Sequence, residues 1–200
     1  MTPARSEGSP QLRFYPADKK RWKDLEKLFG KNGACAGCWC MWWKQSAKEF
    51  SQNNGEKNEK LLKRRIESGE VPGILVYHKD QPMAWIAVEP REAYPRLERS
   101  RTLKKVDDKP VWSVVCFFIA KEYRRQGASA QVLKAAVDYA RKQGAKIIEG
   151  YPNVTKNKKW PDPWLWMGLA SVFQKAKFVE VLRRSKSKPI MRYYVRQNRN

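Results

Sequence analysis

A short basic turn near the middle of the chain has the residue types that bind a phosphate or pyrophosphate. From residue 122 to residue 130 it reads Glu-Tyr-Arg-Arg-Gln-Gly-Ala-Ser-Ala. Gly127 lets the backbone approach an anion without a Cβ in the way, and a helix that begins here presents amide groups and partial positive charge. Arg124 and Arg125 add two full charges, which is typical of an anion site. From the turn alone, an ordinary strand-to-helix connection with surface arginines is an equally good interpretation.

The elements on either side of this turn are those needed to position it. Residues 111–119 are almost continuously apolar, as in a strand buried on both faces. Residues 128–143 repeat apolar positions at helical spacing and end before Gly144, a residue suited to a C-terminal cap. Residues 145–151 are predicted to return as a strand, which Pro152 ends. The candidate anion site therefore joins a strand to a helix.

This stretch resembles the central motif of the GNAT superfamily of N-acetyltransferases. In that motif an apolar strand is followed by Arg-x-x-Gly-x-Gly/Ala, a helix and a strand; here Arg124, Gly127 and Ser129 take the patterned positions. The order of elements matches in kind over about residues 11–196, but the motif is specific only over 112–152 and, weakly, 164–182. The resemblance implies acetyl-CoA (coenzyme A) as cosubstrate and no metal.

The resemblance also implies a fold and a set of cofactor contacts. The fold would be α/β, with a mixed, mostly antiparallel sheet of six to seven strands, flanking helices and a central splayed parallel pair. Residues 1–10 are expected to be a flexible tail before one domain over 11–200. The backbone of residues 117–119 would pair with the pantetheine arm and the turn would hold the pyrophosphate. The implied cofactor-binding residues are Phe117, Phe118, Ile119, Arg124, Arg125, Gln126, Gly127, Ala128, Ser129 and Ala130.

Candidate acid and base residues lie on the neighbouring predicted strands. Glu89 and Glu149 are candidate bases, and Tyr151 and Cys116 are candidate acids. The alternatives are an ion-paired or solvated carboxylate, a packed tyrosine and a core cysteine. A further family motif often has a tyrosine acid where this chain has Phe173, so the resemblance does not supply a residue that protonates the thiolate.

A patch of cysteine and tryptophan at residues 35–43 carries a second possible chemistry. Cys35-x-x-Cys38-x-Cys40 invites a zinc interpretation, but no second Cys/His pair follows it. The preferred interpretation is an aromatic wall of an acceptor pocket, and core packing is its alternative. That wall would combine tryptophans from two parts of the chain, Trp39, Trp42, Trp43, Trp160, Trp164 and Trp166.

Composition limits the choice of function. The 200 residues include 42 Lys and Arg against 20 Asp and Glu, a net charge of +22, so anionic partners are favoured. The hypothesis is an enzyme transferring an acetyl group to a small-molecule or peptide amine in the cytoplasm, without membrane contact. A GNAT-like nucleic-acid-binding module, or an inactive acyl-CoA-binding relative, is the alternative. The oligomeric state is open, a homodimer being one option.

The rest of the chain is expected to complete the sheet and its helices. A strand at 11–15, a helix capped by Asp18 and one or two polar helices over 46–69 precede a hairpin of 73–78 and 83–88. Residues 91–110 are predicted to be a long basic loop, functional or mobile. A helix over 164–175 and a hairpin of 178–184 and 190–196 follow a second basic loop.

Overall fold

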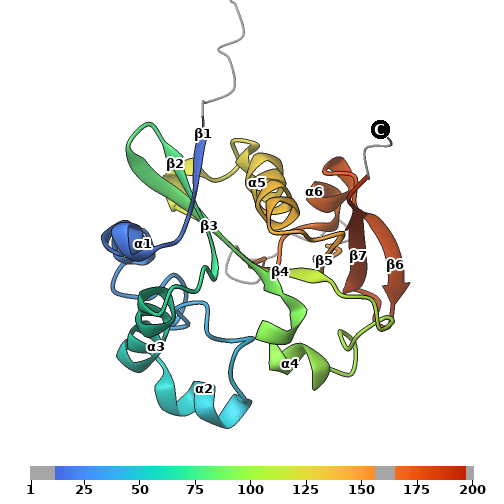
Figure 1. Ribbon diagram of the computed structural model, residues 1–200, viewed down its shortest axis with the longest axis horizontal. Coiled ribbons are helices and arrows are strands. Elements are labelled where there is room, and N and C mark those ends of the chain that lie inside the picture. Colours follow the sequence, from blue (N-terminus) through green and yellow to red (C-terminus); the bar gives the residue numbers. More distant parts are fainter. Residues whose placement is uncertain (1–11, 156–164, 197–200) are drawn as a thin grey trace, which may run out of the picture.

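A single sheet of seven strands runs through the molecule in the order β1-β2-β3-β4-β5-β7-β6 (Figure 1). The computed structural model describes residues 12–155 and 165–196, so the predicted tail lies outside the described residues. Among the described strands only β4 and β5 are parallel neighbours, which confirms the expected mixed, mostly antiparallel sheet. The strands are β1 (Leu12–Pro16), β2 (Gly73–His78), β3 (Gln81–Pro90), β4 (Trp112–Ile119), β5 (Ile147–Gly150), β6 (Val179–Arg183) and β7 (Pro189–Tyr194).

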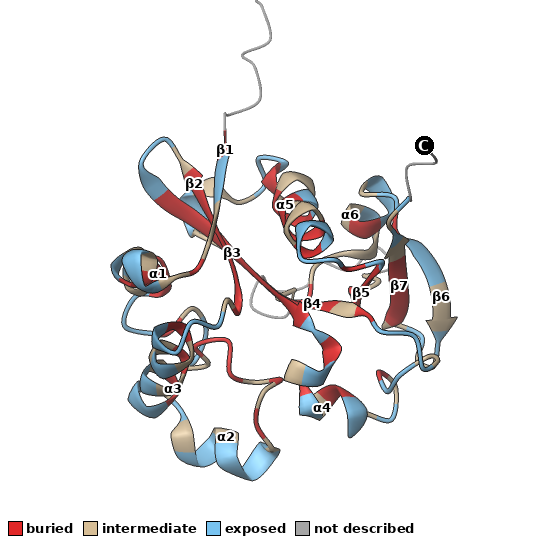
Figure 2. Cartoon of the chain, in the orientation of Figure 1, coloured by how far each residue is buried: buried red, intermediate tan, exposed pale blue. Residues whose placement is uncertain are grey.

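Helices cover both faces of this sheet. Helices α5 and α6 lie on one face, and α1, α3 and α4 lie on the other (Figure 1). Two apolar clusters fill the two interfaces, and Figure 2 shows the central strands buried and the outer sides of α2 and α3 exposed. No described helix has the length and hydropathy that a membrane span needs. The helices are α1 (Trp22–Phe29), α2 (Ala47–Asn53), α3 (Glu56–Glu67), α4 (Pro95–Glu98), α5 (Ala128–Lys142) and α6 (Ala170–Lys175), with short 3₁₀ helices η1 (Lys19–Arg21), η2 (Arg91–Ala93) and η3 (Lys121–Tyr123).

Local sequence explains several element ends. Asp18 caps η1 by accepting a hydrogen bond from the Arg21 amide at 3.1 Å. Ser46 and Glu49 form a capping box at the start of α2, in which each side chain bonds the other residue's amide. Gly144 follows α5 with a φ of 90°, the left-handed angle that ends many helices. These predicted boundaries are therefore confirmed.

β4 contains one residue more than the strand it pairs with. Ala87 pairs with Cys116 and the next residue, Val88, pairs with Val114, so Val115 has no partner in β3. On the other edge of β4 the parallel pairing with β5 ends at Val114 and Gly150. A bulge bends a strand and increases its twist, so β4 and β5 separate where the extra residue sits.

The prediction of one helix over 164–175 is wrong for residues 165–169, and Trp164 lies outside the described residues. α6 begins only at Ala170. Before it, the Phe117 amide donates a hydrogen bond to the Trp166 carbonyl at 2.6 Å, and Leu169 forms a parallel bridge with Asn153. Separation of β4 from β5 leaves backbone groups without a ladder partner, and this segment supplies partners for them. That tertiary requirement overrides the local helical pattern.

The predicted loop over 91–110 is folded onto the sheet. It begins with η2 and α4, so the loop prediction is wrong for residues 91–98. Arg192 of β7 holds Asp107 through two hydrogen bonds of 2.7 and 2.9 Å. Arg184 donates to the carbonyls of Lys104 and Lys105 at 2.6 and 3.0 Å. Long arginine side chains from the last hairpin thus order a segment that has few apolar residues.

Asp107 should make stability depend on pH at the acid end. Its hydrogen bonds from Arg192 lower its pKa from 3.8 to about 2. Because the folded-state pKa is depressed, the stabilisation is complete above about pH 4 and is lost as the pH falls toward 2. We expect D107N to unfold at lower urea concentration than wild type at about pH 6, and the difference to shrink below about pH 4.

Urea denaturation followed by circular dichroism across this pH range measures the effect. D108N is the matched control, because the neighbouring carboxylate is 90% exposed and pairs with the flexible Lys105. A D107N defect that stays constant from about pH 6 to 3 would contradict the assignment.

Candidate active site

The basic turn after β4 contains two residues with left-handed backbone angles. Arg125 and Gly127 have φ of 62° and 79°. Successive amides in a turn of this kind can form an anion-binding nest. Gly127 is the N-cap of α5, and in the part of the chain that the structure describes this N-cap makes no side-chain cap hydrogen bond. Apart from the turn and helix backbone next to it, no atom of the described residues lies within 4 Å of where a Cβ on Gly127 would be.

Arg124 ties this turn to the end of β4. Its Nε donates to the Ile119 carbonyl at 2.7 Å, and its guanidinium lies 5.9 Å from the Phe118 ring centre. Gln126 Nε2 donates to the Glu122 carbonyl at 2.7 Å, which closes the turn on itself. The structure therefore holds the turn against the end of the strand through Arg124, while Phe117 and Ala128 of the predicted set are buried.

Beyond the bulge, backbone amides at the end of β4 already have hydrogen-bond partners. The Ala120 amide points to β3, where it bonds the Met83 carbonyl at 2.9 Å. Amide directions alternate along a strand, so Ile119 shares the opposite edge with Phe117. The Phe117 amide is already bonded to Trp166, as described above. Phe118 pairs with Trp85 of β3 through its backbone and turns its ring toward a cavity.

That cavity, of about 290 Å³, lies between the Cys35–Trp43 segment, α2 and the end of β4. All four cysteines of the chain line it, together with two alanines. Five aromatic side chains complete the wall, Trp42, Trp43, Phe50, Phe118 and Trp166, and Phe117 borders the cavity although its ring packs on the other face against Phe173. Trp39 is not among them, because it stacks on Trp22 in the core with ring centres 6.0 Å apart. Trp160 and Trp164 lie outside the described residues.

The four thiols differ in their surroundings. Cys35 is exposed and Cys38 half-buried, whereas Cys40 and Cys116 are buried. Trp85 Nε1 donates to the Cys40 sulfur at 2.9 Å. Burial raises the pKa of Cys38 to about 12. A hydrogen bond with Cys40, and to a lesser extent burial, raises the pKa of Cys116 well above its ordinary value. In the described residues no group of three or more His, Cys, Asp or Glu side chains is arranged to hold a metal ion.

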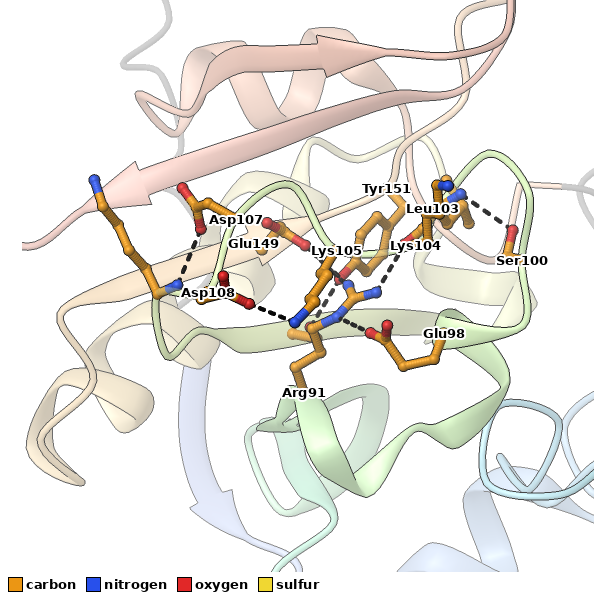
Figure 3. A network of polar contacts seen from close by, with 12 residues as sticks. Arg91, Glu98, Ser100, Leu103, Lys104, Lys105, Asp107, Asp108, Glu149 and Tyr151 are labelled. Atoms are coloured by element: carbon orange, nitrogen blue, oxygen red, sulfur yellow. Dashed lines mark hydrogen bonds and ion pairs between the residues drawn. The ribbon is translucent and has the colours of Figure 1, made fainter.

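Glu149 and Tyr151 belong to a buried polar network around Arg91 (Figure 3). Arg91 Nη1 donates to Glu149 at 3.0 Å and to the Tyr151 hydroxyl at 2.6 Å, while Arg192 Nε donates to the other Glu149 oxygen at 2.8 Å. The Tyr151 hydroxyl donates to Glu149 at 2.7 Å and lies 2.8 Å from Ser113 Oγ. Burial, and then the Glu149 charge, raises the pKa of Tyr151 well above 10.

Glu89, the other candidate base, is also held in ion pairs. Its carboxylate pairs with Lys44, and Arg65 lies 3.3 Å from its second oxygen. The side chains of Lys44 and Glu89 are only 4% and 8% exposed. Lys44 also lies 4.7 Å from the centre of the Tyr94 ring. None of these groups lines the cavity.

Phe173 packs in the core behind β4 and β5. It is fully buried, with ring centres 5.9 Å from Phe117 and 4.9 Å from Phe178. A Cβ on Gly150 would collide with its ring, so the glycine permits this contact. The lone histidine, His78, lies against Tyr123 at the turn of the β2–β3 hairpin.

Comparison with known families now decides the relationship. A sequence model of the acetyltransferase (GNAT) family matches residues 25–158, more than half of the chain. The chain belongs to this family. A search of the curated proteins gives no match.

Solved structures with the same fold include several GNAT proteins. A GNAT acetyltransferase from Listeria monocytogenes has a TM-score of 0.59 at 8% identity, with 96% of this chain and 99% of that chain covered. The NatC complex bound to Gag peptide and CoA has a TM-score of 0.52 at 8% identity, covering 93% and 99%. The PaiA N-acetyltransferase of Thermoplasma acidophilum, in complex with coenzyme A, has a TM-score of 0.50 at 14% identity, covering 92% and 99%. At these identities the likeness shows the fold alone.

Two residues of this GNAT chain are central to the structure but gave no distinct sequence signal. Arg91 makes four hydrogen bonds from the start of the folded connection, yet it is one of many basic residues. Lys44 is buried beside Glu89 although it follows a tryptophan pair in a segment read as an aromatic patch. Their partners are distant in sequence, so no local spacing identifies them.

Disruption of the Arg91 network should first lower the stability of the fold. We expect E149Q to lower the free energy of unfolding by about 3–5 kcal/mol, because two buried arginines lose a charged partner. E98Q is the matched control: Glu98 also bonds Arg91, at 2.7 Å, but is 49% exposed, so its loss should cost less than about 1 kcal/mol. Urea denaturation at neutral pH compares the two variants, and equal losses would refute this reading.

Proposed function

We propose that the protein is an N-acyltransferase that moves an acetyl group from acetyl-CoA directly to an amine of a small-molecule or peptide acceptor. The observation that carries the proposal is the left-handed glycine turn at Arg125–Ser129, which begins α5 shortly after the separated end of β4. Family membership supports acyl transfer in general. Two of the similar structures contain coenzyme A, and one of these also contains a peptide.

The turn has the features that a pyrophosphate needs. The amides of Gln126, Gly127, Ala128 and Ser129 would donate hydrogen bonds to it, and Arg125 would add charge from the rim. Ala128 and Ala130 keep the first turn of α5 narrow. Arg124 would act mainly by holding the turn against Ile119. When bound, the cofactor supplies an acyl group activated as a thioester.

In this proposal fewer residues pair with pantetheine through their backbone than the sequence suggested. Ile119 presents its backbone at the separated edge of β4, so we assign the pairing to that residue. Phe117 contributes its amide only if the bond to Trp166 opens. Phe118 contributes its ring, because its backbone pairs with β3.

Proximity, rather than a dedicated base, is the main catalytic device in this proposal. Glu149, Tyr151 and Glu89 are held by arginine or lysine and lie away from the cavity wall, so we assign them positioning roles. Correct placement of an amine beside a thioester supplies the larger part of an acyl-transfer rate enhancement. A base adds about 10²–10⁴-fold, so its absence slows the reaction without abolishing it.

Cofactor binding tests the proposal directly. We expect acetyl-CoA at about 100 times its Kd to stabilise the fold by about 2.7 kcal/mol, seen as a higher melting temperature. R125Q should weaken coenzyme A binding about 10-fold in calorimetry, because a charged hydrogen bond contributes about 1.5 kcal/mol.

R141Q is the matched control for that substitution. Arg141 lies in the last turn of α5, at the end opposite to the basic turn, and is 57% exposed, so the variant removes the same charge away from that turn. An unchanged melting temperature with saturating acetyl-CoA would remove the basis of the proposal. Binding without thiol release across many amines would instead indicate an inactive acyl-CoA-binding relative.

A further inference from the structure

We propose that the cavity between residues 34–43, α2 and the end of β4 receives the aromatic group of the acceptor, which is a weakly basic aromatic amine. The inference deepens the proposed function and rests on it. It concerns the chemical class of the acceptor, which family membership leaves open. It also gives a role to the cysteine and tryptophan segment.

The wall of the cavity has the chemistry of an aromatic binding site. Among the described lining residues none carries a charge, and half are aromatic. Several rings already meet edge to face, as between Trp42 and Phe50 at 4.9 Å and Trp42 and Trp166 at 6.5 Å. A further ring fits such an arrangement. The volume of about 290 Å³ is at the small end of ligand pockets, which suits one or two rings.

The thiols contribute to this wall as small apolar groups. The raised pKa values keep Cys38 and Cys116 protonated at neutral pH, so these thiols are poor nucleophiles. Protonated cysteine packs as a small hydrophobic residue. The sulfur atoms therefore widen the cavity without adding charge to it.

The cavity has a floor and a mouth, and both bear on what occupies it. Cys116 forms the floor at the end of β4, beside the edge assigned to pantetheine. Cys35, which also lines the cavity, is exposed, so the cavity meets solvent at that residue. A ligand can enter there independently of the cofactor. This favours an acceptor over the acyl chain of a long acyl-CoA, which would arrive from the β4 side.

An uncharged wall also selects for the basicity of the amine. An ammonium group in this cavity would lose its hydration, and the described lining residues offer it no carboxylate, which disfavours the charged form. The reaction needs the neutral amine: its nitrogen lone pair forms the C–N bond as the thioester C–S bond breaks. The nitrogen then loses one proton, and the released thiolate gains one through solvent. Arylamines are already neutral at pH 7, so they avoid the deprotonation step.

Steady-state transfer to three amines tests the class. The probes are aniline, benzylamine and 1,4-diaminobutane, with coenzyme A release followed by chromatography. We expect kcat/KM for the two aromatic amines to exceed that for the diamine by about 10–100-fold, from burial of the ring. We expect kcat/KM for aniline to be flat from about pH 6 to 9, and that for benzylamine to rise tenfold per pH unit toward the amine's own pKa.

Two tryptophan variants locate the effect. W166L removes a ring from the cavity wall but keeps the backbone carbonyl that bonds Phe117. It should raise KM for aniline about 10-fold and leave coenzyme A affinity unchanged. W112L is the control, because Trp112 is a half-buried tryptophan of β4 that packs on Tyr139 of α5, away from the cavity. It should leave that KM unchanged.

Alkylation of Cys35 gives a readout that needs no turnover. Because Cys35 lies at the mouth, aniline should slow its reaction with iodoacetamide in the wild-type protein without coenzyme A. Three results would overturn the inference: no protection of Cys35, a preference for the diamine, or a W166L effect on acyl-chain preference with no change in amine KM. Failure of acetyl-CoA to bind would overturn the proposed function instead, and protection of Cys35 would still report on the cavity.

Discussion

One extra residue in β4 organises the region where the chemistry is expected. Without the bulge at Val115, strict alternation would turn Cys116 toward α5 and Phe117 toward the opposite face. With it, Val115 and Cys116 both pack on the α1 side, and Phe117 packs on the α5 side. The same irregularity ends the pairing of β4 with β5. The separated strand edge and the floor of the cavity thus have one geometric cause.

The sequence was informative where a pattern is local. Helix α5 with its terminal glycines, the β2–β3 hairpin and the buried β4 follow from periodicity and turn residues within a few positions. The anion-binding turn follows from Gly127 and the adjacent arginines, because amides at a helix start need no distant partner. The family motif then extended these local features to a mixed, mostly antiparallel sheet with a central parallel pair, which the structure confirms.

The sequence was uninformative where a partner lies far along the chain. Nothing in Val114-Val115-Cys116 marks the bulge, since it depends on how β3 pairs with β4. Residues 165–169 look helical by their sequence, but the Trp166 carbonyl accepts from the Phe117 amide and the Gly168 carbonyl accepts from the Asn153 amide. Glu149 and Tyr151 resemble catalytic residues by position. However, Arg91 donates hydrogen bonds to both of them, and Arg192 donates one to Glu149. Long-range hydrogen bonding decided each of these outcomes.

The contrast between an uncharged cavity wall and a strongly basic chain affects how the two substrates reach the protein. A net charge of +22 attracts an anion such as coenzyme A over a Debye length of about 8 Å at physiological salt, and it repels cations over the same range. A polyamine would approach against that field, whereas a neutral aromatic amine would diffuse through it unaffected. Encounter rates would therefore separate the two classes of amine before either touches the cavity, and added salt would weaken that separation without altering the wall.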